Sequence, residues 1–152
     1  TQVSARHMLE RGGGHIINIA SIAGVTPVPG LSVYSATKHA VRAFSLSAML
    51  ELRSKGVYVT AICPSTVQTP MLDNQQQVDA AELFFSGRRI LTVEDIERAV
   101  MRALRKRPFE VHVPWWRLRF VQLLGLFPWF GPWVLPLYKR SGRRRQRDRR
   151  GG

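Results

Sequence analysis

The chain has little cysteine, and its few histidines are far apart, which narrows the chemistry it can perform. Cys63 is the single cysteine among 152 residues. No disulfide can therefore form within the chain, and nothing indicates an oxidising compartment. The histidines are His7, His15, His39 and His112, and no spacing of cysteine, histidine and carboxylate predicts a metal site. We therefore expect no metal cofactor.

Acidic residues are also scarce, with 10 Asp and Glu against 23 Lys and Arg, so the formal net charge is +13. Much of the excess lies in residues 139–152, which are rich in arginine and contain Asp148 as their one acid. Such blocks are usually solvated and disordered, and we predict a disordered tail. An anionic membrane surface and nucleic acid are the functional alternatives. No aromatic residue lies among these arginines to stack on a base, so nucleic acid is disfavoured.

The N-terminus shows no signal peptide, and we expect a cytoplasmic protein. Thr1 stands where an initiator methionine would, which indicates a partial sequence. The length and the 45% hydrophobic content are enough for one domain with a core.

Apolar patterning predicts an α/β fold with parallel strands. Two nearly continuous apolar runs and a short third segment predict parallel strands, and one largely apolar and one amphipathic stretch predict the main helices. Gly12, Gly13 and Gly14 predict a helix end and a turn. Thr92 and Asp95 predict a capping box at the start of the second long helix. The predicted strands are 15–20, 57–63 and 109–113, and the predicted helices are 1–11, 33–54 and the segment after 91.

Tyr34 and Lys38 are four residues apart in the first long helix and so share one face of it. A nearby ammonium group favours the phenolate form of a tyrosine, which can then exchange a proton near neutral pH. Ser21 follows the first predicted strand, where its hydroxyl could orient a substrate oxygen. These residues predict proton transfer to a carbonyl or from an alcohol. A lone Tyr–Lys pair at this spacing is more often part of an amphipathic face, so the surrounding motifs matter.

The surroundings resemble the short-chain dehydrogenase/reductase family over residues 1–113. Three motifs carry the resemblance: N-x-x-S-x-x-G from Asn18 to Gly24, YxxxK from Tyr34 to Lys38, and P-x-x-V-x-T from Pro64 to Thr69. The resemblance implies NAD(P)-dependent interconversion of an alcohol and a carbonyl. It implies that residues 1–113 are the C-terminal part of a Rossmann-type, doubly wound parallel sheet.

The resemblance also implies a role for each motif residue. The implied catalytic residues are Ser21, which binds the substrate oxygen, Tyr34, the acid/base, and Lys38, which favours the phenolate and holds the nicotinamide ribose. The nicotinamide carboxamide would contact Val67 and Thr69, beside Pro64. Ser65 departs from the family, which usually has glycine there. The choice between NAD and NADP stays open.

The glycine-rich turn that cradles the pyrophosphate in this family is absent from these residues. Two interpretations follow. The chain is part of a dehydrogenase, or it is a truncated, non-catalytic protein that binds a membrane or a partner and keeps half of the fold.

Two further alternatives concern single segments. Residues 71–89 form either a lid over the substrate or a surface helix, and the apolar helix 33–54 packs on the sheet or pairs with a second copy, as the family implies.

Residues 114–138 form an apolar extension rich in tryptophan and proline. The run from Phe120 to Tyr138 carries no charge, but Pro128, Pro132 and Pro136 argue against a regular transmembrane helix. Its aromatic residues and the adjacent basic tail suit a peripheral attachment to an anionic membrane through 115–150. Internal packing around the substrate pocket or a dimer interface is the alternative. A lipophilic alcohol or ketone is the substrate that such an extension favours.

Overall fold

The computed structural model describes residues 1–70, 72, 89–116, 129 and 131–150. Three parallel strands form one sheet in the order β1 (Gly14–Ile19), β2 (Val57–Pro64) and β3 (Glu110–Val113). The register pairs Ile16 with Val59 and Cys63 with His112. The central strand β2 is buried over almost its whole length, which explains its nearly continuous apolar sequence.

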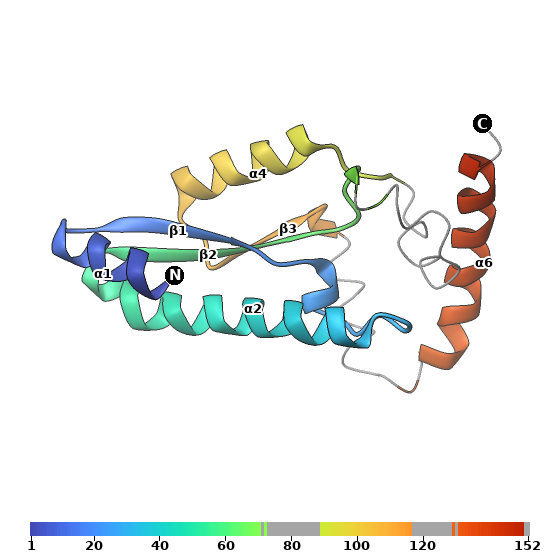
Figure 1. Cartoon of the computed structure of the whole chain (residues 1–152), viewed down its shortest axis with the longest axis horizontal. Coiled ribbons are helices and arrows are strands. Elements are labelled where there is room, and N and C mark those ends of the chain that lie inside the picture. The colour runs from blue at the N-terminus through green and yellow to red at the C-terminus, as the bar shows by residue number, and fades with distance from the viewer. Residues whose placement is uncertain (71, 73–88, 117–128, 130, 151–152) are drawn as a thin grey trace.

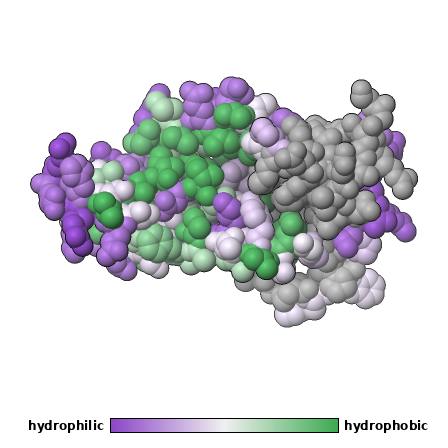
Figure 2. All heavy atoms as spheres, viewed as in Figure 1, coloured by the Kyte–Doolittle hydropathy of each residue, from purple (hydrophilic) through white to green (hydrophobic). Residues whose placement is uncertain are grey.

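Helices cover both faces of the sheet, so the core has three layers (Figure 1). Helix α2 (Ser32–Leu52) packs on one face, where Met49 and Ala48 contact Val59. Helix α4 (Val93–Lys106) packs on the other, where Ala99 and Ala103 contact Ile62. Figure 2 shows apolar side chains gathered over α4 and β1 on the visible face. The predicted α/β fold with three parallel strands is confirmed.

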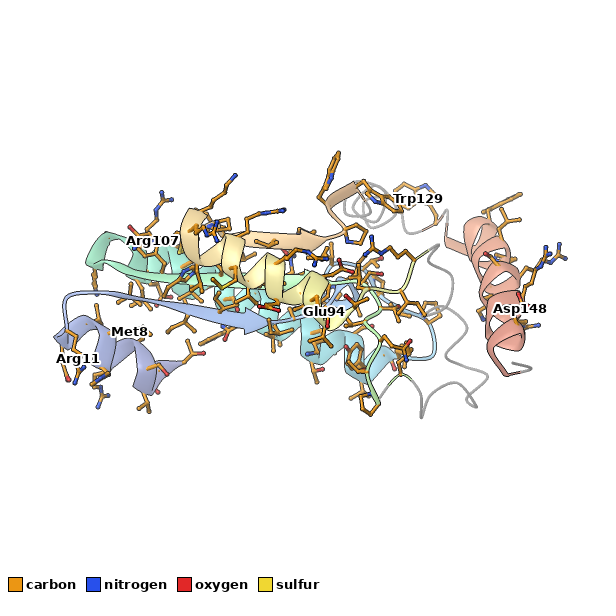
Figure 3. All side chains as sticks on the ribbon, turned by 90° about the horizontal axis from the view of Figure 1, so that it is seen from above. Met8, Arg11, Glu94, Arg107, Trp129 and Asp148 are labelled. Atoms are coloured by element: carbon orange, nitrogen blue, oxygen red, sulfur yellow. The ribbon has the colours of Figure 1, made fainter. Side chains whose placement is uncertain are left out.

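Local sequence signals account for the ends of these elements. Helix α1 (Gln2–Glu10) runs into the turn at Gly12, whose φ of 83° is in the left-handed region. A short 3₁₀ turn, η2 (Arg53–Lys55), follows α2 and ends at Gly56, where φ is 80°. Thr92 and Asp95 form the predicted capping box of α4. Figure 3 shows Glu94 at the start of α4 and Arg107 at its end, an order that suits the helix dipole.

The C-terminal segment differs from the sequence prediction. Helix α6 (Gly131–Arg150) continues through the region predicted to be a disordered tail, and the predicted boundary between 138 and 139 falls inside it. It includes Pro136, one of the prolines that argue against a regular transmembrane helix. Figure 1 places α6 beyond the carboxyl ends of the strands. Within the described residues no helix is long and apolar enough to cross a membrane. The predicted lid and most of the uncharged run lie outside those residues.

A close backbone contact joins the end of β1 to α2. A short 3₁₀ helix, η1 (Ile22–Gly24), follows Ser21, and its last residue, Gly24, lies against the backbone of α2. A Cβ on Gly24 would lie 2.5 Å from the carbonyl oxygen of Lys38 and 2.8 Å from its carbonyl carbon. Only glycine allows this approach, because backbone atoms cannot move aside as a flexible side chain can.

We therefore expect Gly24→Ala to destabilise the protein by about 1–3 kcal/mol, the usual cost of overpacking a tight contact. Chemical unfolding would measure the change. Gly14→Ala is the comparison variant, because the nearest atoms to a Cβ there belong to the Met8 side chain, which can move aside, and not to backbone. Equal losses for the two variants would contradict the tight-contact explanation.

Candidate active site

Ser21 lies where β1 ends, and its side chain is buried. Its Oγ accepts a hydrogen bond from the backbone N–H of Ala23 at 3.1 Å, as the cap of η1. A hydroxyl that accepts in this way still has its own proton to donate. Ser21 is therefore able to donate a hydrogen bond to an oxygen atom at the carboxyl edge of the sheet.

Tyr34 and Lys38 lie in the first two turns of α2, next to the end of β1. The Lys38 Nζ donates to the backbone oxygen of Ile19 at 3.3 Å and lies 5.7 Å from the centre of the Tyr34 ring. Both side chains are partly exposed. The structure thus brings the predicted ammonium group and phenol together, and Lys38 reaches the strand that leads into Ser21. No hydrogen bond between Ser21 and Tyr34 is present in this part of the chain.

Asn18, the first residue of the N-x-x-S-x-x-G motif, ties β1 to α2 from inside the molecule. Its Nδ2 donates to Ser45 Oγ at 2.9 Å, and Ser45 donates in turn to the backbone oxygen of Val41 at 2.7 Å. Ser45 is fully buried. A buried side-chain amide and hydroxyl satisfied in this way hold the strand and the helix at one spacing.

The predicted nicotinamide loop follows β2 at the same edge of the sheet. Pro64 ends the strand, and Ser65 N–H donates to the Val113 carbonyl at 2.8 Å. Val67 forms a parallel bridge with Leu91, and the Thr69 carbonyl accepts from Leu72 N–H at 2.9 Å. The loop backbone is therefore held from both sides. The structure places Pro64, Val67 and Thr69 just beyond β2, the neighbour of the strand that ends before Ser21.

A group of charged and polar side chains on the α2 face of the sheet was not predicted as a unit. Arg42 of α2 binds both carboxylate oxygens of Glu110 on β3, with Nε on Oε1 and Nη2 2.9 Å from Oε2. Cys63 Sγ donates to Oε1 at 3.3 Å, and the Cys63 side chain packs in one cluster with Ala20, the residue before Ser21, and Ala61. His112 Nε2 lies 3.1 Å from Oε1 at an ion-pair distance, without the angle of a hydrogen bond. We call Arg42, Glu110, Cys63 and His112 the buried network.

Within this network the surroundings keep the Cys63 thiol protonated and the Glu110 carboxyl group ionised. Burial, followed by the negative charge of Glu110, raises the pKa of the Cys63 thiol to about 12, so the thiol keeps its proton and donates it. Burial alone would raise the pKa of Glu110, but His112 and Arg42 outweigh it and lower that pKa to about 2. Glu110 is therefore a carboxylate at neutral pH.

Cys63, Glu110 and His112 also present their donor atoms within 4.8 Å of one another. The guanidinium of Arg42 already occupies both oxygens of Glu110 and places a positive charge where a cation would bind. The contacts thus describe a charge-paired network. The sequence carried one signal for it, because Glu110 and His112 alternate along one strand and so point to one face.

Comparison with known proteins identifies the family. Residues 1–80, more than half of the chain, match the short chain dehydrogenase family. The chain belongs to this family.

Three proteins illustrate the similarity. A 2-dehydro-3-deoxy-L-rhamnonate dehydrogenase (NAD(+)) of a Sphingomonas species is 47% identical over 74 residues, which are 47% of this chain and 30% of the relative. The acetoin dehydrogenase structure from Salmonella typhimurium has a TM-score of 0.60 at 32% identity, over 74% of this chain and 47% of that one. A short-chain dehydrogenase from Sphingobium yanoikuyae, solved with NADPH, has a TM-score of 0.64 at 27% identity, over 75% and 43%. The chain spans less than half the length of each.

The Glu110 carboxylate predicts a pH-dependent stability. Because its folded pKa of about 2 is below the ordinary 4.5, the carboxylate contributes stability above pH 4.5 that is lost as the pH falls toward 2. We expect Glu110→Gln to be less stable than the natural protein at neutral pH, with a difference that shrinks on acidification. Urea unfolding from about pH 6 to about pH 3 measures it. Glu97→Gln, at an exposed position on α4, is the control, and a pH-independent difference for Glu110→Gln would contradict the assignment.

Proposed function

We propose that this chain carries the proton-transfer part of an NAD(P)-dependent oxidoreductase that interconverts a small alcohol and its carbonyl. One observation supports this most strongly. Lys38 bridges the Tyr34 ring and the end of β1, directly before Ser21, at the edge of the sheet where ligands of this fold class bind. The family membership and the names of the relatives, among them an acetoin dehydrogenase, support the same reaction type.

In the proposed mechanism each residue acts on the substrate oxygen. The Ser21 hydroxyl donates a hydrogen bond to the carbonyl oxygen and orients it. Tyr34 gives its phenolic proton to that oxygen as the carbon gains a hydride, so the carbonyl becomes an alcohol, and it takes the proton back in the reverse direction. Lys38 stabilises the phenolate that remains. When bound, the nicotinamide supplies the hydride in reduction and accepts it in oxidation.

The described residues fit the nicotinamide end of such a cofactor. Lys38 has three N–H donors, of which the Ile19 oxygen accepts one, leaving donors for ribose hydroxyls. The Thr69 hydroxyl is partly exposed on a loop held from both sides, where it can hydrogen-bond a carboxamide. Pro64 and Val67 offer apolar contacts beside it. The choice between NAD and NADP stays open, since the relatives include an NAD(+) enzyme and one solved with NADPH.

Tyr34→Phe in the intact protein should lower the rate of diacetyl reduction by at least about a hundredfold, the low end for acid–base catalysis. The ring stays in place, so folding and the Lys38 contact should be retained. Absorbance of the reduced cofactor follows the rate. Tyr58→Phe is the control, since Tyr58 packs against Arg107 and His15 elsewhere in the fold. A Tyr34→Phe enzyme that keeps its activity would overturn the mechanism.

The C-terminal segment favours a second property, attachment to an anionic membrane surface. Trp115 is 71% exposed, and Trp133 at the apolar start of α6 is 80% exposed. Figure 3 shows Trp129 on the side of the sheet where the strands end. The rest of α6 is strongly basic, and apolar insertion combined with basic charge is the pair of signals that stable peripheral binding needs. Such attachment would give the site access to lipophilic alcohols or ketones.

Replacement of Lys139, Arg140 and Arg144 by Gln should weaken binding to phosphatidylserine-containing vesicles by at least about tenfold, since each basic residue near such a surface contributes about 1 kcal/mol. Co-sedimentation measures the change, with pure phosphatidylcholine as the neutral reference. Replacement of Arg102, Arg105 and Lys106 on α4 by Gln is the matched control. Equal binding to both vesicle types, or binding to RNA alone, would contradict the membrane proposal.

Two further proposals concern assembly and completeness. Phe44, which is 52% exposed, and Leu50 lie on α2 and would be covered if two copies paired through this helix.

The intact mass of the native protein separates the enzyme from the non-catalytic alternative. A mass well above 17.3 kDa supports the enzyme, and a mass equal to it favours a membrane- or partner-binding protein.

A further inference from the structure

Arg42 continues the line of side chains that begins with Tyr34 and Lys38. The three residues are spaced by four, so they share one stripe of α2. Lys38 fastens the start of this stripe to the end of β1 through the Ile19 oxygen. Arg42 fastens it to β3 through both oxygens of Glu110. The helix that carries the proposed acid/base is thus held to the sheet at two successive turns.

The buried network also reaches the residue that would orient the substrate. Cys63 lies opposite His112 in the register of β2 and β3, and its thiol donates to Glu110 at 3.3 Å. The Cys63 side chain also packs in one cluster with Ala20, the residue before Ser21. A continuous set of contacts therefore leads from Ala20, next to Ser21, through Cys63 and Glu110 to Arg42. One end of this set precedes the substrate-facing hydroxyl, and the other end lies one turn beyond Lys38.

The energetics favour a role in orientation over one in stability. The side chains of Arg42 and Glu110 are only 25% and 16% exposed, so both charges have lost much of their hydration. The attraction within such a pair often fails to offset this loss, and apolar side chains of similar volume can be equally stable. A bidentate guanidinium–carboxylate pair, however, has a fixed geometry that an apolar contact lacks.

We propose that Arg42 and Glu110 are positioning residues that set the placement of Tyr34 and Lys38 relative to Ser21. The proposal rests on the proposed oxidoreductase function. Loss of the bidentate contact between Arg42 and Glu110 leaves α2 packed on the sheet but free to shift by a fraction of a side-chain width. Proton transfer is sensitive to such shifts, because it requires the phenol and the substrate oxygen to be aligned at hydrogen-bond distance.

The test compares three variants of the intact protein in diacetyl reduction. Arg42→Lys keeps the charge but loses the two-point geometry, and Glu110→Gln loses the charge. Arg42→Met combined with Glu110→Leu replaces the pair by apolar residues. We expect kcat to fall about tenfold or more in all three variants, with KM for diacetyl changed less than threefold. Arg98→Met, which removes an exposed ion pair on α4, is the control and should leave kcat unchanged.

The apolar pair separates positioning from stability. We expect its melting temperature to match that of the natural protein while kcat stays low and the midpoint of the pH–rate profile moves. Recovery of kcat together with the melting temperature would overturn the proposal, since packing alone would then suffice. Natural kcat in either single variant would overturn it as well.

Tyr34→Phe, assayed alongside, distinguishes a failure of the positioning proposal from a failure of the proposed oxidoreductase function. An inactive Tyr34→Phe enzyme with a fully active apolar pair would refute positioning and leave the proposed function intact. An active Tyr34→Phe enzyme would refute the function itself, and the positioning proposal with it.

Discussion

The contact between Gly24 and the backbone of Lys38 is the constraint on which the site depends. It brings the turn after Ser21 against the helix that carries Tyr34 and Lys38, with no side chain between them. The packing of Met49 on Val59 and the link from Asn18 to Ser45 hold the rest of α2 at a matching distance from the sheet. The end of β1 and the first turns of α2 thus lie side by side and together form the surface of the candidate site. Proton transfer needs such rigidity, because alignment contributes a large part of the rate.

Charged side chains on the α2 face of the sheet fix the position of α2 more narrowly than apolar packing does. Apolar contacts hold α2 against β2 but permit small displacements along the helix axis. The carboxylate of Glu110, kept ionised by His112 and Arg42, joins β3 to α2 in a defined geometry. Cys63, kept as a thiol by burial, donates to that carboxylate and packs in one cluster with Ala20, the residue before Ser21.

Much of the fold was predictable because its signals are local. The predicted strands match the observed ones to within one residue, and Thr92 and Asp95 predicted the start of α4. The buried network was not predictable as a unit, because Arg42 and Glu110 are 68 residues apart and meet only through the tertiary fold. Helix α6 runs through most of the segment 139–152 that was predicted as a tail, and arginine is a good helix former; the division of the chain at 138 stays a prediction. The roles of Ser21, Tyr34 and Lys38 stay predictions that the geometry supports.

A crystal structure of the intact protein with a nicotinamide cofactor and acetoin would show directly whether Ser21, Tyr34 and Lys38 form the active site. We predict that the hydroxyl oxygen of acetoin lies within about 3 Å of both Ser21 Oγ and Tyr34 Oη, the distance of an O–H···O hydrogen bond. We also predict that Lys38 Nζ contacts the nicotinamide ribose. Acetoin bound with its oxygen away from these two hydroxyls, or a nicotinamide seated elsewhere on the protein, would contradict the assignment of the site.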